Sequence, residues 1–272
     1  MKFHTLVKTM LIVVGTASWA SAQKLSAEEI NDLSYQASQY FRQANDLIRT
    51  SPSEAYKLYD QVILRYQRIV EEGGISNGRL YYNMGNAYLL KGDIGRSILN
   101  YRRGQRLMPD NPDLAKNLGY ARSQRLDQVS IQAEKRVLQT LFFWHYDLSM
   151  QAKFFLTSCL WAVGCVFGSL WLWLKRNRFA LWIMGITFLV GLFLAGSLIV
   201  DRYNEKAHRQ GVITLDSVVA RQGDGDNYPA SFTEPLHSGT EFDLLEERRE
   251  WLRIELSSGD EAWIPIASAG II

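Results

Sequence analysis

The side chains of this 272-residue chain best suited to acid–base, nucleophilic or metal chemistry are four histidines and two cysteines. No histidine has a neighbour at the spacing of a metal-ligand pair, and the sequence contains neither a glycine-rich phosphate loop nor a serine nucleophile elbow. The cysteines stand about 240° apart around a helix, so they share no face. We therefore predict that the protein is not an enzyme and holds no metal or other cofactor. The residues considered are His4, His145, His208, His237, Cys159 and Cys165.

The turn Asp224-Gly-Asp226 begins like a calcium-binding loop, in which carboxylate oxygens supply most of the ligands. Such a loop ends with an acidic ligand, and Pro235 stands where that ligand would be. Proline offers no side-chain oxygen, so we expect no calcium site here.

The net charge of the chain and the distribution of its apolar residues indicate which kinds of element carry these side chains. The chain has 30 Lys and Arg against 28 Asp and Glu, a net charge of +2. A balance this close excludes a polycation, and we expect no nucleic-acid partner. Apolar residues are instead gathered in one N-terminal block and two long central runs, which predicts export and membrane insertion.

Residues 1–22 are typical of a secretory signal peptide. Two lysines flank the start of a short apolar stretch, and Ala20-Ser21-Ala22 supplies a small-x-small cleavage site. An uncleaved anchor is the alternative, but an apolar stretch of about ten residues rises only about 15 Å as a helix, roughly half of a bilayer core. We expect cleavage before Gln23.

Two uncharged runs, 154–174 and 179–200, are each long enough to cross a bilayer. A helix of this length rises about 32 Å. Three of the four residues in the loop between them, 175–178, are Lys or Arg, which places that loop in the cytoplasm. We therefore predict a hairpin in the bacterial cytoplasmic membrane, with both folded parts of the chain on the extracytoplasmic side. Those parts are residues 23–137, joined to the first span by a linker at 138–153, and residues 211–272.

Residues 23–137 are rich in helix formers, and residues 78–111 carry a repeat signature. An aromatic-x2-hydrophobic-Gly-x2-Tyr helix is followed, after a Lys-Gly-Asp turn, by a small-x3-aromatic-x2-small helix and a proline. This pattern resembles the tetratricopeptide repeat, which implies paired antiparallel helices stacked in an array. A degenerate repeat at 41–74 precedes it, and a capping helix begins at Asn111. The predicted packing positions are Tyr81, Met84, Gly85, Tyr88, Ser97, Tyr101, Gly104 and Pro109.

The other side of the first helix of this repeat is a candidate peptide groove. In the repeat family that side grips extended peptides, and amides and a cation there are suited to hydrogen bonds with a partner's backbone or terminal carboxylate. A solvated helix face is the alternative interpretation. The candidate groove residues are Arg79, Tyr82, Asn83 and Asn86.

Residues 211–272 alternate between short apolar strands and Gly, Asp or Asn turns, which predicts a small all-β barrel. Four short motifs occur in the order found in the bacterial Src-homology-3-like family, which this segment resembles. The motif positions are Arg221, Gly239, Trp251 and Trp263.

The two predicted extracytoplasmic parts carry opposite charge. Residues 96–125 contain seven Lys or Arg and two Asp, whereas residues 211–272 contain four Arg and twelve Asp or Glu. Docking between them, or of both to one shared partner, is one hypothesis. Anionic lipid headgroups, an acidic partner or a merely solvated face are the alternatives for the basic strip.

The predicted fold class is an α-helical tetratricopeptide repeat domain, a two-helix transmembrane hairpin and a small all-β Src-homology-3-like barrel. This order, with the string from Tyr81 to Asp113 and the triplet Trp144-His145-Tyr146, resembles the BatE proteins of the bacterial aerotolerance operon. The resemblance implies a non-catalytic membrane scaffold that works with von Willebrand factor A-type membrane proteins and a MoxR-type ATPase, in stress tolerance or in the assembly of envelope complexes.

A cell-wall adaptor is the alternative, in which the C-terminal barrel holds peptidoglycan while the repeats recruit an enzyme. A sensor is disfavoured, because four cytoplasmic residues cannot form an output domain.

Overall fold

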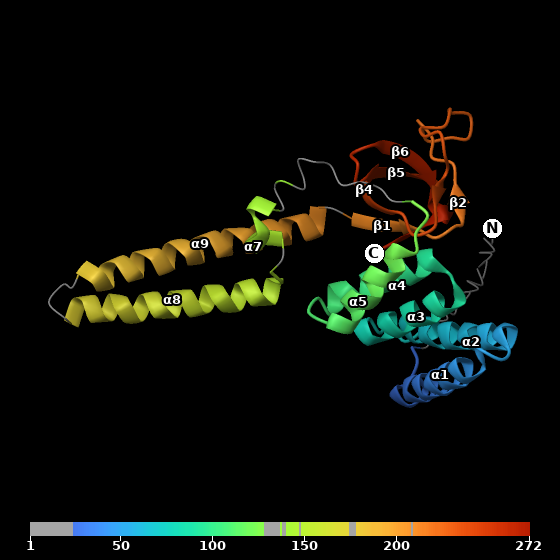
Figure 1. The fold of residues 1–272 in the computed structure, drawn as a ribbon, viewed down its shortest axis with the longest axis horizontal. Coiled ribbons are helices and arrows are strands. Elements are labelled where there is room, and N and C mark those ends of the chain that lie inside the picture. The colour runs from blue at the N-terminus through green and yellow to red at the C-terminus, as the bar shows by residue number, and fades with distance from the viewer. Residues whose placement is uncertain (1–23, 128–136, 138–139, 147, 174–177, 208) are drawn as a thin grey trace, which may run out of the picture.

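The computed structural model describes residues 24–127, 137, 140–146, 148–173, 178–207 and 209–272 (Figure 1). The predicted signal peptide and most of the predicted cytoplasmic loop lie outside the described residues. A long helical hairpin projects from a body in which a helical array and a small sheet lie side by side.

The N-terminal part is an array of antiparallel helices, in which α1 packs on α2, α2 on α3, α3 on α4, and α5 on α4 and α3. A Gly-Asp turn joins α3 to α4, and Gly92 there adopts a φ of 83°, which a side chain would disfavour. The helices are α1 (Ala27–Leu47), α2 (Pro52–Glu71), α3 (Gly78–Lys91), α4 (Ile94–Leu107) and α5 (Pro112–Ser123).

Local sequence signals decide where these helices begin. The side chains of Ser26, Asn77, Asp93 and Asn111 accept hydrogen bonds from first-turn backbone N–H groups of α1, α3, α4 and α5. At α1 the cap is reciprocal, since the Glu29 carboxylate also accepts a bond from the Ser26 backbone. The helix α2 instead begins with a proline, whose missing N–H costs nothing at that position.

Aromatic and small side chains fill the space between the helices. Tyr59 and Tyr101 are fully buried, and the Gly85 Cα lies so close to Tyr101 that an added Cβ would stand 2.5 Å from its ring. Glycine is therefore required where α3 crosses α4, because a methyl group would push the two helices apart.

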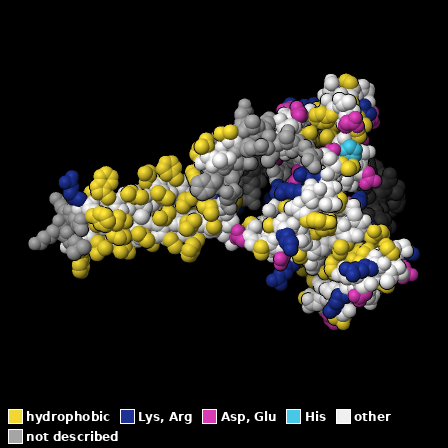
Figure 2. All heavy atoms as spheres, in the orientation of Figure 1, with side chains coloured by type: hydrophobic (Ala, Val, Ile, Leu, Met, Phe, Trp, Pro, Cys, Tyr) yellow, Lys and Arg dark blue, Asp and Glu magenta, His cyan; other side chains and the backbone are white. Residues whose placement is uncertain are grey.

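The hairpin consists of α8 (Met150–Trp173) and α9 (Arg178–Ala207), preceded by the single turn α7 (Phe143–Tyr146). Both long helices are long and apolar enough to cross a membrane. Most of their large apolar side chains are exposed, and Figure 2 shows that these cover the visible face of the projecting part. Close contact between the helices occurs at Gly164 and Gly191, where a Cβ would collide with Phe188 and Trp161.

Both helices extend beyond the uncharged runs used to predict them. The helix α8 begins four residues before residue 154, and α9 continues seven residues past residue 200. The extensions bring Lys153 and Asp201 into the hairpin.

The C-terminal part is an antiparallel sheet with the strand order β6-β5-β4-β1-β7, accompanied by a two-stranded β2-β3 ribbon. Its alternating apolar side chains form their own core, which includes Ile213, Ile254 and Ile264. The strands are β1 (Arg209–Ile213), β2 (Ser217–Val218), β3 (Leu236–His237), β4 (Glu241–Arg248), β5 (Trp251–Leu256), β6 (Glu261–Pro265) and β7 (Ala269–Ile271), with the 3₁₀ turn η1 (Ile266–Ser268) before β7.

In the described residues this β-module does not close into the predicted barrel. The strands β2 and β3 are two residues long and pair only with each other as a ladder, so they cannot bridge the two edges of the larger sheet. Isolated bridges from Arg221 to Trp263 and to Ala230 hold the intervening segment against β6 instead.

Candidate functional site

The predicted repeat-packing residues lie mainly inside the helical array. Met84, Gly85, Tyr88, Ser97, Tyr101 and Gly104 are buried, Tyr81 is half-buried and Pro109 is exposed. The Ser97 hydroxyl donates a 3.0 Å hydrogen bond to the Gly85 carbonyl, which ties α4 to α3.

The candidate groove residues join α3 to its neighbours. The Asn83 amide donates to the Tyr66 hydroxyl of α2 at 3.3 Å. The Asn86 carbonyl oxygen accepts from the Tyr101 hydroxyl of α4 at 2.6 Å and from the Asn117 amide of α5 at 2.9 Å. That same Asn117 amide also donates to the Tyr82 hydroxyl at 3.1 Å. Of the four candidates, Arg79 alone is exposed, so a partner on this face would meet Arg79 first.

The β-module rests on α4 and α5 with little space between them. An added Cβ on Gly270 would lie 2.3 Å from the Leu99 side chain, and one on Gly95 would lie 2.5 Å from the Ile213 carbonyl oxygen. Val212 from β1 joins the apolar cluster formed by Ile98 and its neighbours in the array. The two parts therefore form one packed body, and we call their contact the junction.

A largely buried carboxylate, 18% exposed, lies in the junction. Glu241 at the start of β4 accepts two 2.7 Å hydrogen bonds from the Arg122 guanidinium, a bidentate arrangement. Arg102 and Arg125 approach the same carboxylate at 3.1 and 3.4 Å. Burial alone would raise the pKa of Glu241, but the hydrogen bonds and charges of Arg122 and then of the other two arginines hold it below its ordinary value.

A second carboxylate, Asp127 just after α5, binds the β-module from the other side. It accepts hydrogen bonds from the His237 backbone N–H at 2.6 Å, the His237 Nδ1 at 2.7 Å and the Thr240 hydroxyl at 2.7 Å. Burial would raise the pKa of Asp127, and these donors together lower it below its usual range. A carboxylate only accepts, so Nδ1 carries the imidazole proton.

Two further arginines of α4 bind the last residues of the sheet. The Arg103 guanidinium donates to the Ile271 carbonyl oxygen at 2.6 and 3.1 Å, and Arg106 donates to that of Ile272 at 2.8 Å. Burial lowers the pKa of Arg103. The hypothesis that the basic strip docks on the acidic module is thus confirmed within one chain, with Arg102, Arg103, Arg106, Arg122 and Arg125 making the contacts.

The four motif positions of the β-module fall into two groups. The backbones of Arg221 and Trp263 exchange two 2.8 Å hydrogen bonds, and the Arg248 guanidinium lies 5.2 Å from the Trp263 ring centroid. Trp251 begins β5 at the same end of the module. Gly239 lies at the other end, in the turn before β4, with a φ of 93° and an added Cβ position 2.9 Å from the Arg125 side chain.

Sequence reasoning missed a polar cluster at the end of the hairpin. The Lys153 ammonium, only 1% exposed, lies 2.5 Å from the Asp201 carboxylate and 2.5 Å from the His145 carbonyl oxygen. The His145 ring also lies 2.6 Å from the Ser197 hydroxyl. The cluster thereby ties α7, α8 and α9 together. The membrane spans are predicted from runs without charged residues, so this prediction leaves Lys153 and Asp201 outside both spans.

In the described part of the chain, no group of three His, Cys, Asp or Glu side chains is placed to hold a metal ion. The charged groups described above are instead used in contacts between elements of the chain. A comparison of the chain with protein-family models and with curated proteins finds no match.

Acid is expected to open the junction. The pKa values of Asp127 and Glu241 are depressed when the parts are docked, so the docked form binds fewer protons than the undocked form. Their contribution is therefore complete above pH about 4.3 and is lost as the pH falls through the depressed values. The distance between spin labels at Lys116→Cys and Asp260→Cys, in a Cys159→Ala/Cys165→Ala background, should broaden between pH 7 and pH 3. A distribution that stays narrow at both pH values would contradict this expectation.

Proposed function

We propose that this protein is a non-catalytic, membrane-anchored scaffold of the bacterial envelope that binds other envelope proteins, as its resemblance to BatE proteins implies. The observation that carries the proposal is the junction. Five arginines and the carboxylates of Asp127 and Glu241 are used in docking the two folded parts into one body. Two parts that are docked in this way and anchored by one apolar hairpin are suited to presenting binding surfaces at a fixed position relative to the membrane.

The proposed topology places this body outside the cytoplasm. The chain enters the hairpin at α8 and leaves it at α9 on the side of the body, so both ends of the hairpin next to the body face the same compartment (Figure 1). The cations of the predicted loop 175–178 favour the cytoplasm for the opposite end. The protein would then reside in the cytoplasmic membrane with its binding surfaces in the periplasm or its equivalent.

At the finer level we propose that the helical array is a tetratricopeptide repeat domain and that the β-module is an open relative of the Src-homology-3-like family. The close crossing at Gly85 and the pairing of α1 with α2 and α3 with α4 support the first assignment. The pairing of the Arg221 and Trp263 motifs supports the second.

The expected partners are membrane proteins with a von Willebrand factor A-type domain. A photo-crosslinking amino acid at Arg79, in the full chain in the membranes of its own cells, should capture such proteins. The same group at Lys57, an exposed residue of α2, serves as the matched control and should capture several-fold less of them. Purification of the full chain without a protein partner, together with equal capture at both sites, would contradict the scaffold function.

The second candidate function, a cell-wall adaptor, is supported by a hollow of about 430 Å³ on the β-module. It is lined by Asp224, Arg248, Arg249 and Trp251, at the opposite end of β4 from the junction. Retention of the full chain on purified sacculi, lost on changing Trp251 to alanine, would favour the adaptor over the scaffold.

A further inference from the structure

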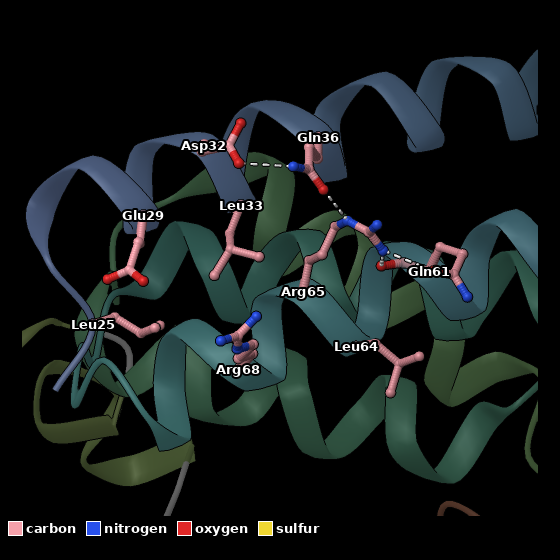
Figure 3. A pocket seen from close by; sticks show the side chains of 9 residues that line it. All are labelled: Leu25, Glu29, Asp32, Leu33, Gln36, Gln61, Leu64, Arg65 and Arg68. Atoms are coloured by element: carbon pink, nitrogen blue, oxygen red, sulfur yellow. Dashed lines mark hydrogen bonds between the residues drawn. The ribbon is translucent and has the colours of Figure 1, made fainter. Parts of the chain in front are cut away.

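The first two helices enclose a groove of about 420 Å³ whose walls carry opposite charge (Figure 3). Glu29 and Asp32 project from α1, and Arg65 and Arg68 project from α2. Leu25 and Leu33 lie between the two walls, and Leu64, which is 55% exposed, lines the groove on the α2 side (Figure 3).

The charges of this groove are not all paired within the described part of the chain, although Glu29 and Arg68 attract each other across it. The Asp32 carboxylate accepts a 2.8 Å hydrogen bond from the Gln36 amide, and the Gln36 carbonyl oxygen accepts one of 2.9 Å from Arg65. Among the described residues, neither Asp32 nor Arg65 forms an ion pair. Arg68 does pair with Glu72, but both side chains are half exposed, and such a pair adds little to stability.

The groove lies at the end of the array that the β-module leaves open. The helices α4 and α5 are covered by the junction at the other end, whereas α1 begins the array. Helical arrays need a capping element at each end, because an uncapped end exposes apolar side chains. Leu64 is such a side chain.

A second copy of this chain has the charge pattern that this groove requires. If a two-fold axis runs along the groove, rotation brings the acidic wall of one copy onto the basic wall of the other, and the reverse contact forms at the same time. The antiparallel arrangement of α1 and α2 makes the levels match, since Asp32 lies opposite Arg68 across the groove (Figure 3). A two-fold axis across the groove would instead set acid against acid.

The membrane anchor restricts the direction of the two-fold axis. Two copies in one membrane with the same topology can be related only by an axis along the membrane normal, and the hairpin runs along that normal. A dimer of this kind in one membrane therefore requires the groove to lie along the membrane normal.

We propose that the groove between α1 and α2 is the contact surface of a two-fold dimer of this chain, with Asp32 of each copy facing Arg68 of the other. The proposal uses the proposed membrane topology but not the scaffold function, because it concerns only copies of this chain.

Charge reversal on the full chain, purified in detergent, tests the proposal by measurement of its molar mass. Wild type should be dimeric, and the dissociation constant should rise at least about tenfold in Asp32→Arg and in Arg68→Glu, since each then sets like charges together twice. An equimolar mixture of the two variants should again be dimeric. In the mixed dimer the introduced arginine of one copy faces the introduced glutamate of the other, and the unchanged Asp32 faces the unchanged Arg68. This rescue also shows that both variants fold.

Arg42→Glu, at an exposed position of α1 that does not line the groove, is the matched control and should leave the dimer unchanged. A monomeric wild type would overturn the proposal. So would a dimer that survives both reversals, which would locate the contact elsewhere, or a failure of the mixture to dimerise. Each of these results is independent of whether partner proteins are captured at Arg79.

Discussion

Changing Glu241 to glutamine is expected to release the β-module from the helical array. The substitution keeps the shape of the side chain but removes the anion that Arg102, Arg122 and Arg125 share. Arg102 and Arg125 are about four-fifths buried. Arg122 is more exposed, so solvent screens its charge and its pair with Glu241 contributes less to the free energy of docking. Removing one partner of a buried pair costs roughly 3–5 kcal/mol, so the docked form should lose most of its population.

The spin-label pair at Lys116→Cys and Asp260→Cys measures this release directly. Wild type should give one narrow distance, and Glu241→Gln should give a broad distribution in the same cysteine-free background. Glu246→Gln makes the same chemical change in the same strand and should leave the distance narrow, because among the described residues that carboxylate pairs only with Arg248 of the module itself. An unchanged distribution in Glu241→Gln would show that the remaining contacts, which are the apolar packing at Leu99 and the polar contacts of Asp127 and Arg103, suffice for docking.

The docking itself could be predicted from charge, but its chemistry could not. A count along the sequence separates a basic strip from an acidic module, and charges of opposite sign in one compartment attract. It does not single out Glu241 or Asp127 among many carboxylates, because their partners are brought close only by the tertiary fold. The contribution of each charge to docking also depends on its burial, and burial cannot be read from a charge count.

The candidate groove shows a similar limit. Helical periodicity correctly separates Met84 and Gly85, which are buried, from Arg79, which is exposed. It does not reveal that α2 and α5 lie near enough to hydrogen-bond Asn83 and Asn86. A helix period gives the direction of a side chain on one helix, whereas its surroundings depend on how the neighbouring helices pack.

The barrel prediction was wrong about closure for a related reason. Alternation of apolar residues predicts strands and their buried faces, and these strands form. Closure depends on how long the connecting strands are and on their register, and β2 and β3 end after two residues each.

The predicted spans stop short of Lys153 and Asp201 because hydropathy treats each charge as a separate cost. Lys153 and Asp201 lie on different helices and neutralise each other, so the pair is compatible with an apolar environment that neither charge would tolerate alone. The sequence contains both residues, but only the packing of α8 on α9 makes them partners.

Changing Asp201 to asparagine should therefore weaken the α8–α9 hairpin strongly. Lys153, 1% exposed, would keep the His145 carbonyl oxygen but lose its only anion among the described residues. An uncompensated buried charge costs roughly 3–5 kcal/mol, whereas replacing both charges with apolar groups of similar volume is often neutral. Unfolding of the full chain in bicelles should thus show a large loss in Asp201→Asn and a much smaller one in Lys153→Met/Asp201→Leu. A double-mutant cycle of Lys153→Met, Asp201→Asn and Lys153→Met/Asp201→Asn isolates the coupling between the two charges. Equal losses in the single and double variants would mean that the pair is not coupled, and that the packing of Gly164 and Gly191 holds the hairpin together by itself.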